Sequence, residues 1–450
     1  MVAFTLILCT LGLSAKDVTL SGFTYTADGG PKENKNIKVT YALNSTDKIA
    51  RVKKVVDNNF PQKKSCEIPR TIKVDGVTYK VTKIGAKAFA QAGSNGNMND
   101  ANGKPLYNDL SFTRIKLPNT IVEIGDEAFC YLSSLKEFTL PTKVEKIGKH
   151  AFNHGGSFKS LTVPATCVSI GECAFGYCCI ETLSFADGSK PLTLGRAVFI
   201  HNDIKTLVTP HRLAKWGDSM FWCNYRLTDV TVNGSVSNIS ESCFSSCNSL
   251  ARVTINAPIA SIDEQAFFDC YALSSLKVAS SNTLRSIGEN AFQNCSFTTL
   301  GPDVLPYGLT TIGKSAFHSC KALTSVEFPV TLTRVCDNAF TSCKAIARIK
   351  CLTPIVPVAE WPAFPISIFP MCDVEVLPAL AAQFSVAPVW EYFDWSKYTE
   401  ASVADVGLGD GDTLPVEYYN LNGIRVDVDA LVPGVYIERR GSGSRKVIVR

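Results

Sequence analysis

The sequence predicts a repeat solenoid with a parallel β-sheet on its concave face and short helical, 3-10 or irregular segments on its convex side. Two patterns that recur in phase predict this fold. The first is six residues long, begins as IGAKAF from Ile84 to Phe89, and occurs eleven times. After a first interval of 40 residues, its closing aromatic residue returns every 22 to 25 residues. A period of this length is typical of solenoids, in which each repeat stacks on the next.

The closing aromatic residues of the six-residue pattern predict one buried column. Residues in the same phase of a solenoid occupy equivalent positions in successive turns. We therefore expect their rings to lie in a single file. They are Phe89, Phe129, Phe152, Phe175, Phe199, Phe221, Phe244, Phe267, Phe292, Phe317 and Phe340.

The second pattern predicts one short strand per repeat. It consists of an apolar residue, two variable residues, an apolar residue, one variable residue and an apolar residue, often followed by proline. Leu135, Phe138 and Leu140, with Pro141 after them, are one copy. Apolar side chains two positions apart lie on one face of a strand, and proline ends the strand because it cannot donate a ladder hydrogen bond.

The regions outside the repeats predict caps and a separate C-terminal unit. Residues 1–15 are apolar and end in small residues, which is typical of an export signal. Caps are expected because an open solenoid end exposes an apolar cross-section. We expect a signal peptide at residues 1–15, a β-rich N-terminal cap at 16–65, the repeat array at 66–351, a C-terminal cap at 352–400, a linker at 401–414 and a small β-domain at 415–450.

The charge balance limits the classes of partner. The net charge is only +4, but residues 32–83 contain thirteen Lys or Arg and five Asp or Glu. This surplus fits either a solvated cap face or a patch for acidic glycans or membrane surfaces. No aromatic residues alternate with these lysines, so no nucleic-acid partner is expected. No other run reaches about 18 uninterrupted apolar residues, so no transmembrane span is predicted.

The cysteines follow the repeat. Six of the seventeen fall three residues after the repeat phenylalanine and predict a column of small buried side chains. Bridges between neighbouring turns stay open, because successive turns lie about 5 Å apart. The spacing provides no paired zinc-ligand motif. The six are Cys178, Cys247, Cys270, Cys295, Cys320 and Cys343.

No catalytic motif stands out in the sequence. The five histidines have no Asp, Glu or Cys in a known catalytic spacing, and we expect them at the surface, solvated or hydrogen-bonded. There is no phosphate-binding glycine loop, nucleophile elbow or metalloprotease motif. We therefore expect no catalytic residues, no cofactor and no metal.

The outward side chains of the predicted strands are the candidate binding residues. They flank the central apolar residue of each strand and so point away from the core. Threonine and serine dominate the middle, and charged residues the C-terminal end. Threonine also suits any exposed strand, so plain sheet chemistry and a recognition face both remain open. The candidates are Thr139, Ser160, Thr162, Thr182, Ser184, Thr206, Asp229, Thr231, Arg252, Thr254, Ser275, Lys277, Glu327, Arg348 and Lys350.

The six-residue pattern, the cysteine three residues after it and the strand pattern together resemble the BspA-like class of leucine-rich repeat, across residues 66–351. This resemblance implies a bacterial exported protein, at the cell surface or secreted and associated with the outer membrane. It also implies a non-enzymatic role in adhesion to an extracellular protein of the host matrix or of another cell. The alternative is a surface glycan-binding protein for nutrient capture, which requires aromatic side chains along the sheet. Residues 415–449 resemble the C-terminal domains of exported proteins of Bacteroidetes-type bacteria, some of which are sorting signals.

Overall fold

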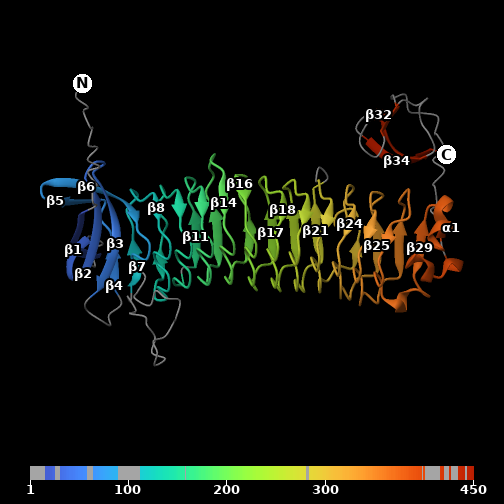
Figure 1. Cartoon of the computed structure of the whole chain (residues 1–450), viewed down its shortest axis with the longest axis horizontal. Helices are drawn as coiled ribbons and strands as arrows, with labels where there is room; N and C mark the ends of the chain where they lie inside the picture. Colours follow the sequence, from blue (N-terminus) through green and yellow to red (C-terminus); the bar gives the residue numbers. More distant parts are fainter. Residues whose placement is uncertain are drawn as a thin grey trace, which may run out of the picture.

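A computed structural model describes residues 16–25, 31–57, 64–89, 112–157, 159–279, 283–397, 399–400, 416–419, 425–426, 434–440 and 443–449. The predicted signal peptide and the predicted linker lie outside the described residues. Figure 1 shows the turns stacked in one long row between two caps. The predicted solenoid is confirmed, and each turn contributes one strand to each of two parallel ladders.

The first ladder contains the predicted strands, and its outward surface is called the long-strand face below. Each of its strands alternates buried and outward residues, as in Ser160–Val163. The ladder is interrupted after β9, β13 and β21. The last of these interruptions precedes Gly301, where the strand pattern in the sequence is also broken. The strands are β7 (Phe112–Lys116), β9 (Glu137–Phe138), β11 (Ser160–Val163), β13 (Thr182–Phe185), β15 (Thr206–Val208), β17 (Asp229–Val232), β19 (Arg252–Ile255), β21 (Ser275–Val278), β23 (Thr299–Leu300), β25 (Ser325–Phe328), β27 (Arg348–Cys351) and β29 (Asp373–Val376).

The second ladder runs along the opposite side of each turn, where the sequence predicts helical, 3-10 or irregular segments. Its strands are mostly two residues long. All but β16 end on the first residue of a six-residue segment that closes with phenylalanine, β16 ends one residue before it, and turns follow the strands. This ladder breaks once, after the strand that precedes Trp216. The strands are β8 (Glu123–Ile124), β10 (Lys146–Ile147), β12 (Ser169–Ile170), β14 (Leu192–Leu194), β16 (Leu213–Lys215), β18 (Asn238–Ile239), β20 (Ser261–Ile262), β22 (Ser286–Ile287), β24 (Thr311–Ile312), β26 (Arg334–Val335) and β28 (Val358–Ala359).

The N-terminal cap joins the two ladders into one sheet. Its strand β4 pairs with β7 of the first ladder, and β6 pairs with β8 of the second. Between them, β1, β2 and β3 are antiparallel neighbours and cover the end of the array. The first turn therefore has no open strand edge. The cap strands are β1 (Lys16–Tyr25), β2 (Pro31–Asn44), β3 (Ile49–Asp57), β4 (Lys64–Glu67), β5 (Thr71–Val74) and β6 (Val77–Ile84).

The C-terminal cap holds the helical elements of the described residues. Trp390 is fully buried there, and its indole N–H donates to the carbonyl oxygen of Pro357 at 2.9 Å. The elements are η1 (Ile366–Ile368), η2 (Pro378–Leu380), α1 (Ala381–Phe384), η3 (Trp390–Tyr392), η4 (Trp395–Lys397) and β30 (Thr399–Glu400). Beyond the linker, an antiparallel sheet has the order β32-β31-β33-β34, with β31 (Val416–Tyr419), β32 (Arg425–Val426), β33 (Gly434–Arg440) and β34 (Gly443–Val449).

The predicted column of phenylalanines forms the core. All eleven rings are fully buried, and consecutive rings stack with centroids between 4.7 Å, for Phe89 and Phe129, and 5.8 Å, for Phe175 and Phe199. Phe364 of the C-terminal cap continues the stack at 5.4 Å from Phe340. The spacing matches the separation of neighbouring strands, so each ring contacts the turn before and the turn after it.

The predicted cysteine column is also present. Each of its six thiols donates to the carbonyl oxygen of the phenylalanine one turn earlier, as Cys178 does to Phe152 at 3.0 Å and Cys343 to Phe317 at 3.0 Å. The sixteen cysteines among the described residues are free thiols. Burial raises the pKa of the Cys178 thiol, which therefore stays protonated and able to donate. Asn202 and Asn224 hold this position in the two turns between Cys178 and Cys247.

Candidate functional site

The structure places the candidate binding residues together on the long-strand face. All fifteen are exposed or half-buried. Strand register aligns them in two parallel rows. Thr206, Asp229, Arg252 and Ser275 face one another in the first row, as consecutive strand partners. The second row runs alongside, two residues further along each strand.

Several of these residues form ion pairs or hydrogen bonds with one another. Arg252 lies 2.6 Å from Asp229, and Lys350 lies 3.1 Å from Glu327. The hydroxyls of Thr162 and Ser184 are hydrogen-bonded at 2.8 Å. The charges of the central and C-terminal parts of the face are therefore partly compensated between neighbouring turns. Exposed ion pairs of this kind contribute little to stability, about 0–1 kcal/mol.

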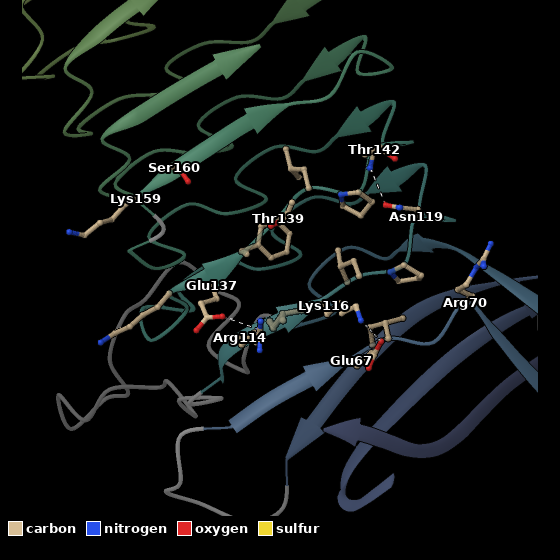
Figure 2. Close-up of a pocket in the computed structure, with 18 residues that line it drawn as sticks. Glu67, Arg70, Arg114, Lys116, Asn119, Glu137, Thr139, Thr142, Lys159 and Ser160 are labelled. Atoms are coloured by element: carbon tan, nitrogen blue, oxygen red, sulfur yellow. Dashed lines mark hydrogen bonds and ion pairs between the residues drawn. The ribbon is translucent and has the colours of Figure 1, made fainter. Parts of the chain in front are cut away.

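The N-terminal part of the long-strand face carries a groove with a volume of about 950 Å³. Four strands contribute to it: β4, β7, β9 and β11 (Figure 2). Pro118 and Pro141 follow the strands β7 and β9 and turn the chain away from the sheet. Of the fifteen candidate residues, only Thr139 and Ser160 line this N-terminal groove.

The N-terminal groove is rich in positive charge. Five cationic side chains and two carboxylates line it. Glu137 pairs with the Arg114 guanidinium at 3.0 Å, and Glu67 with the Lys116 ammonium at 3.2 Å. The remaining cations are Arg70, Lys136 and Lys159.

The cations of the N-terminal groove differ in how well they are compensated. Lys159 lies 3.5 Å from Glu181 of the next turn, and that carboxylate also pairs with Lys205 at 2.7 Å. Arg70 and Lys136 are exposed, and neither has a carboxylate partner among the described residues. Figure 2 shows Arg70 and Lys159 on opposite sides of the groove, with Arg114 and Glu137 between them. Among the described residues, the lining of the groove therefore carries more positive than negative charge.

Glu67 is the least satisfied group in the N-terminal groove. Its side chain is largely buried, and its Oε2 atom has no hydrogen-bond partner in the part of the chain that the structure describes. Burial raises the pKa of Glu67 above its ordinary value, although Lys116 lies beside it.

A second surface feature, an aromatic ridge, was missed by the sequence reasoning. Tyr131, His154, Tyr177 and His201 lie in successive turns, and their rings stack with centroids 5.1, 4.3 and 4.7 Å apart. Each has a left-handed backbone, with φ between 50° and 60°. All four follow the repeat phenylalanine by two residues, so their common phase was visible in the sequence. The expected surface histidines are half-buried at two of these positions.

The comparison with known families decides which repeat this is. The profile of the BspA type leucine-rich repeat region matches six copies, over residues 76–181, 101–222, 168–299 and 285–358. The chain belongs to this family. No curated protein matches it. No helix of the described residues is long and apolar enough to cross a membrane.

Three solved structures of similar fold are distant in sequence. A leucine-rich repeat protein from Bacteroides ovatus is 22% identical, with a TM-score of 0.35, and the match covers 69% of this chain and 92% of that one. A leucine rich cell surface protein from Faecalibacterium prausnitzii is 22% identical, with a TM-score of 0.37 and coverage of 72% and 95%. The pneumococcal vaccine antigen PcpA is 18% identical, with a TM-score of 0.46 and coverage of 82% and 96%.

The aromatic ridge predicts a pH dependence of the BspA-type array. Burial lowers the pKa of His154 and of His201 below the ordinary value, so the folded state binds their protons less tightly than the unfolded chain does. Their contribution to stability is therefore complete above the unfolded pKa of about 6.5, and is lost as pH falls through the lower folded values. We expect the urea midpoint to fall between about pH 7.5 and pH 5, and to fall less in the double variant His154→Tyr, His201→Tyr.

The control for this experiment is His211→Gln, because the His211 side chain is exposed in a turn. That variant should keep the wild-type pH dependence. Circular dichroism during urea denaturation at each pH provides the measurement. An equal change of the urea midpoint with pH in the wild type and in the double histidine variant would contradict the prediction.

Proposed function

We propose that the chain is a non-enzymatic, exported binding protein whose long-strand face recognises an extracellular protein. The observation that carries this proposal is the display of outward side chains on the long-strand face, in register within each group of paired strands, with the basic N-terminal groove at one end. Membership in the BspA type leucine-rich repeat family supports it, since the resemblance implies adhesion to matrix proteins or to other cells. The signal peptide predicted at residues 1–15 and the resemblance of residues 415–449 to C-terminal domains of exported proteins support export to a bacterial cell surface.

The size of the face fits a protein partner. Eleven stacked turns at about 4.8 Å per turn give a surface on the order of 50 Å long. A standard protein interface buries about 800 Å² on each partner, which a surface of this length can provide. Polar, hydrogen-bonding side chains suit such an interface, because a typical protein interface carries about ten direct hydrogen bonds.

Glycan capture is the alternative. It predicts aromatic ring faces exposed along the sheet, where sugars can stack. In the described residues, the exposed rings of Tyr131 and Tyr177 belong to the aromatic ridge, where they stack on histidines that cover their faces. Other exposed rings favour this alternative. They are Trp222, Tyr225, Tyr271, Tyr307, Trp361 and Tyr392, which are 40–53% exposed.

The test uses the full chain in surface plasmon resonance against a panel of extracellular matrix proteins and a panel of polysaccharides. We expect a matrix protein to bind, and the variant Thr162→Tyr, Thr182→Tyr to weaken that binding by about tenfold or more, because two bulky side chains then stand on the face. The matched control is Thr193→Tyr, which alters an exposed threonine of the second ladder. Binding to polysaccharides alone, or equal loss in the control, would overturn the proposal.

A further inference from the structure

We propose that the N-terminal groove binds an acidic, extended segment of the protein partner. This inference rests on the proposed function and names the chemistry that one part of the face would recognise. It comes from three features of the groove: its cations without a described ion-pair partner, a break in the strand ladder, and a floor of largely buried apolar side chains.

Charge is the first feature. Arg114 and Lys116 already face Glu137 and Glu67. Arg70 and Lys136 have no such carboxylate within the described chain, and both are exposed. A carboxylate of a partner can pair with either of them without displacing an internal partner. Complementary charge of this kind accelerates association and selects among ligands.

The position of the cations adds to the charge argument. Arg70 follows β4 of the cap and Lys136 precedes β9 of the array, so the two groups belong to different elements. Lys159 adds a third cation one turn further on and shares Glu181 with Lys205. A ligand that satisfies all three must extend across several strands. A single small anion cannot do so.

The break in the strand ladder is the second feature. The sheet that begins in the cap ends at β9, which is only two residues long, and β11 pairs with β13 alone. Among the described residues, the backbone groups of β11 on its β9 side therefore make no ladder hydrogen bonds. Extended peptides use such groups when they add to a sheet.

The groove floor is the third feature. Leu117, Phe138 and Leu140 line the groove and are 5–8% exposed, so small apolar surfaces lie between the cations. Side chains of an extended peptide alternate in direction, and one set can contact this floor while acidic neighbours contact the cations. Sugar rings instead stack on open aromatic faces, and Phe138, the one aromatic side chain among the described residues that line the groove, is almost covered. The combination favours a polypeptide over a sulfated or carboxylated glycan.

The test measures binding of fluorescent peptides to the full chain by anisotropy. One peptide of about twelve residues alternates Glu or Asp with Val or Thr, a second replaces each acidic residue by its amide, and heparin serves as the polysulfated glycan probe. We expect the acidic peptide to bind at least about tenfold more tightly than its amide counterpart, and the difference to shrink as salt increases.

Two matched variants locate the site. Arg70→Gln, Lys136→Gln removes the uncompensated cations of the groove. Lys277→Gln, Arg348→Gln removes two exposed cations elsewhere on the same face, which also have no ion-pair partner among the described residues. We expect the first variant to lower the affinity for the acidic peptide by about tenfold, and the second to lower it by less than about twofold. All four positions are exposed, so thermal denaturation of both variants should match that of the wild type.

The outcomes separate this inference from the proposed function. Equal binding of the acidic and amide peptides, heparin binding without peptide binding, or equal loss in both variants would overturn the inference. If the matrix protein of the panel still binds to Arg70→Gln, Lys136→Gln with unchanged affinity, the inference fails and the proposed function stands. If the acidic peptide binds in the groove and no matrix protein binds, the proposed function fails instead.

Discussion

Replacing Phe267 by alanine is expected to lower the free energy of unfolding by about 3–5 kcal/mol. The ring is fully buried near the middle of the phenylalanine column, stacked 5.4 Å from Phe244 and 5.2 Å from Phe292. Its removal leaves a cavity that neighbouring turns cannot fill, because their strand pairing fixes the distance between them. Urea denaturation of the full chain followed by circular dichroism measures the loss.

Two variants in the same turn control for this prediction. Phe267→Leu keeps most of the apolar volume and should cost less than half as much as Phe267→Ala. Tyr271→Ala alters a side chain that is 51% exposed and should change the free energy of unfolding by no more than about 0.5 kcal/mol. A cost for Phe267→Ala as small as that of Tyr271→Ala would show that the column does not hold neighbouring turns together.

The phenylalanine column was predictable because its information is redundant. Eleven residues repeat in one phase, and a solenoid converts equal phase into equal position. Substitution at a single copy, such as Trp216 at the start of its six-residue pattern, cannot hide the period. The structure even keeps that residue in the core, where Trp216 is 4% exposed and its indole N–H donates to the carbonyl oxygen of Asn238 at 3.0 Å.

The N-terminal groove was not predictable in the same way. The sequence placed Thr139 and Ser160 on the outward surface, but the cations Arg70, Lys136 and Lys159 lie outside the central positions of the strands. Their importance depends on which charges neutralise one another, and that is set by distances between side chains of different turns. The interruption of the ladder between β9 and β11 was not predictable either. The strand pattern is present in both of these turns, so the sequence shows no sign of the break.

The aromatic ridge was predictable from the sequence only in part. Its residues share a phase, so their alignment followed from the period alone. Their stacking depends on the left-handed backbone at each position, as at His154 with φ 52° and Tyr177 with φ 57°. The sequence gives little sign of this conformation at Tyr131 and Tyr177, because bulky residues such as tyrosine rarely adopt it, whereas histidine does so more often.

The cysteine column leads to the second large prediction, because two turns replace the thiol by asparagine in different ways. The Nδ2 atom of Asn202 donates to Phe175 at 2.9 Å, and its Oδ1 atom accepts from the backbone N–H groups of Cys178 and Ile180 at 3.2 and 3.0 Å. Asn224 donates to Phe199 at 2.9 Å, but its Oδ1 atom has no partner in the described chain. A cysteine thiol can reproduce the donated hydrogen bond at both positions. It cannot reproduce the two hydrogen bonds that Asn202 accepts, and the Oδ1 atom of Asn224 accepts none in the described chain.

We therefore expect Asn202→Cys to lower the free energy of unfolding by about 2–4 kcal/mol, since it leaves two buried N–H groups without an acceptor. Asn224→Cys should lower the free energy of unfolding by less than about 1 kcal/mol, because it removes the unsatisfied Oδ1 acceptor and breaks no accepted hydrogen bond. Asn202→Ala and Asn224→Ala, which lose the donor as well, provide the matched pair. The same urea titration measures all four variants. Equal costs for the two cysteine variants would mean that accepted hydrogen bonds between turns contribute nothing, and that the position requires only a small buried side chain.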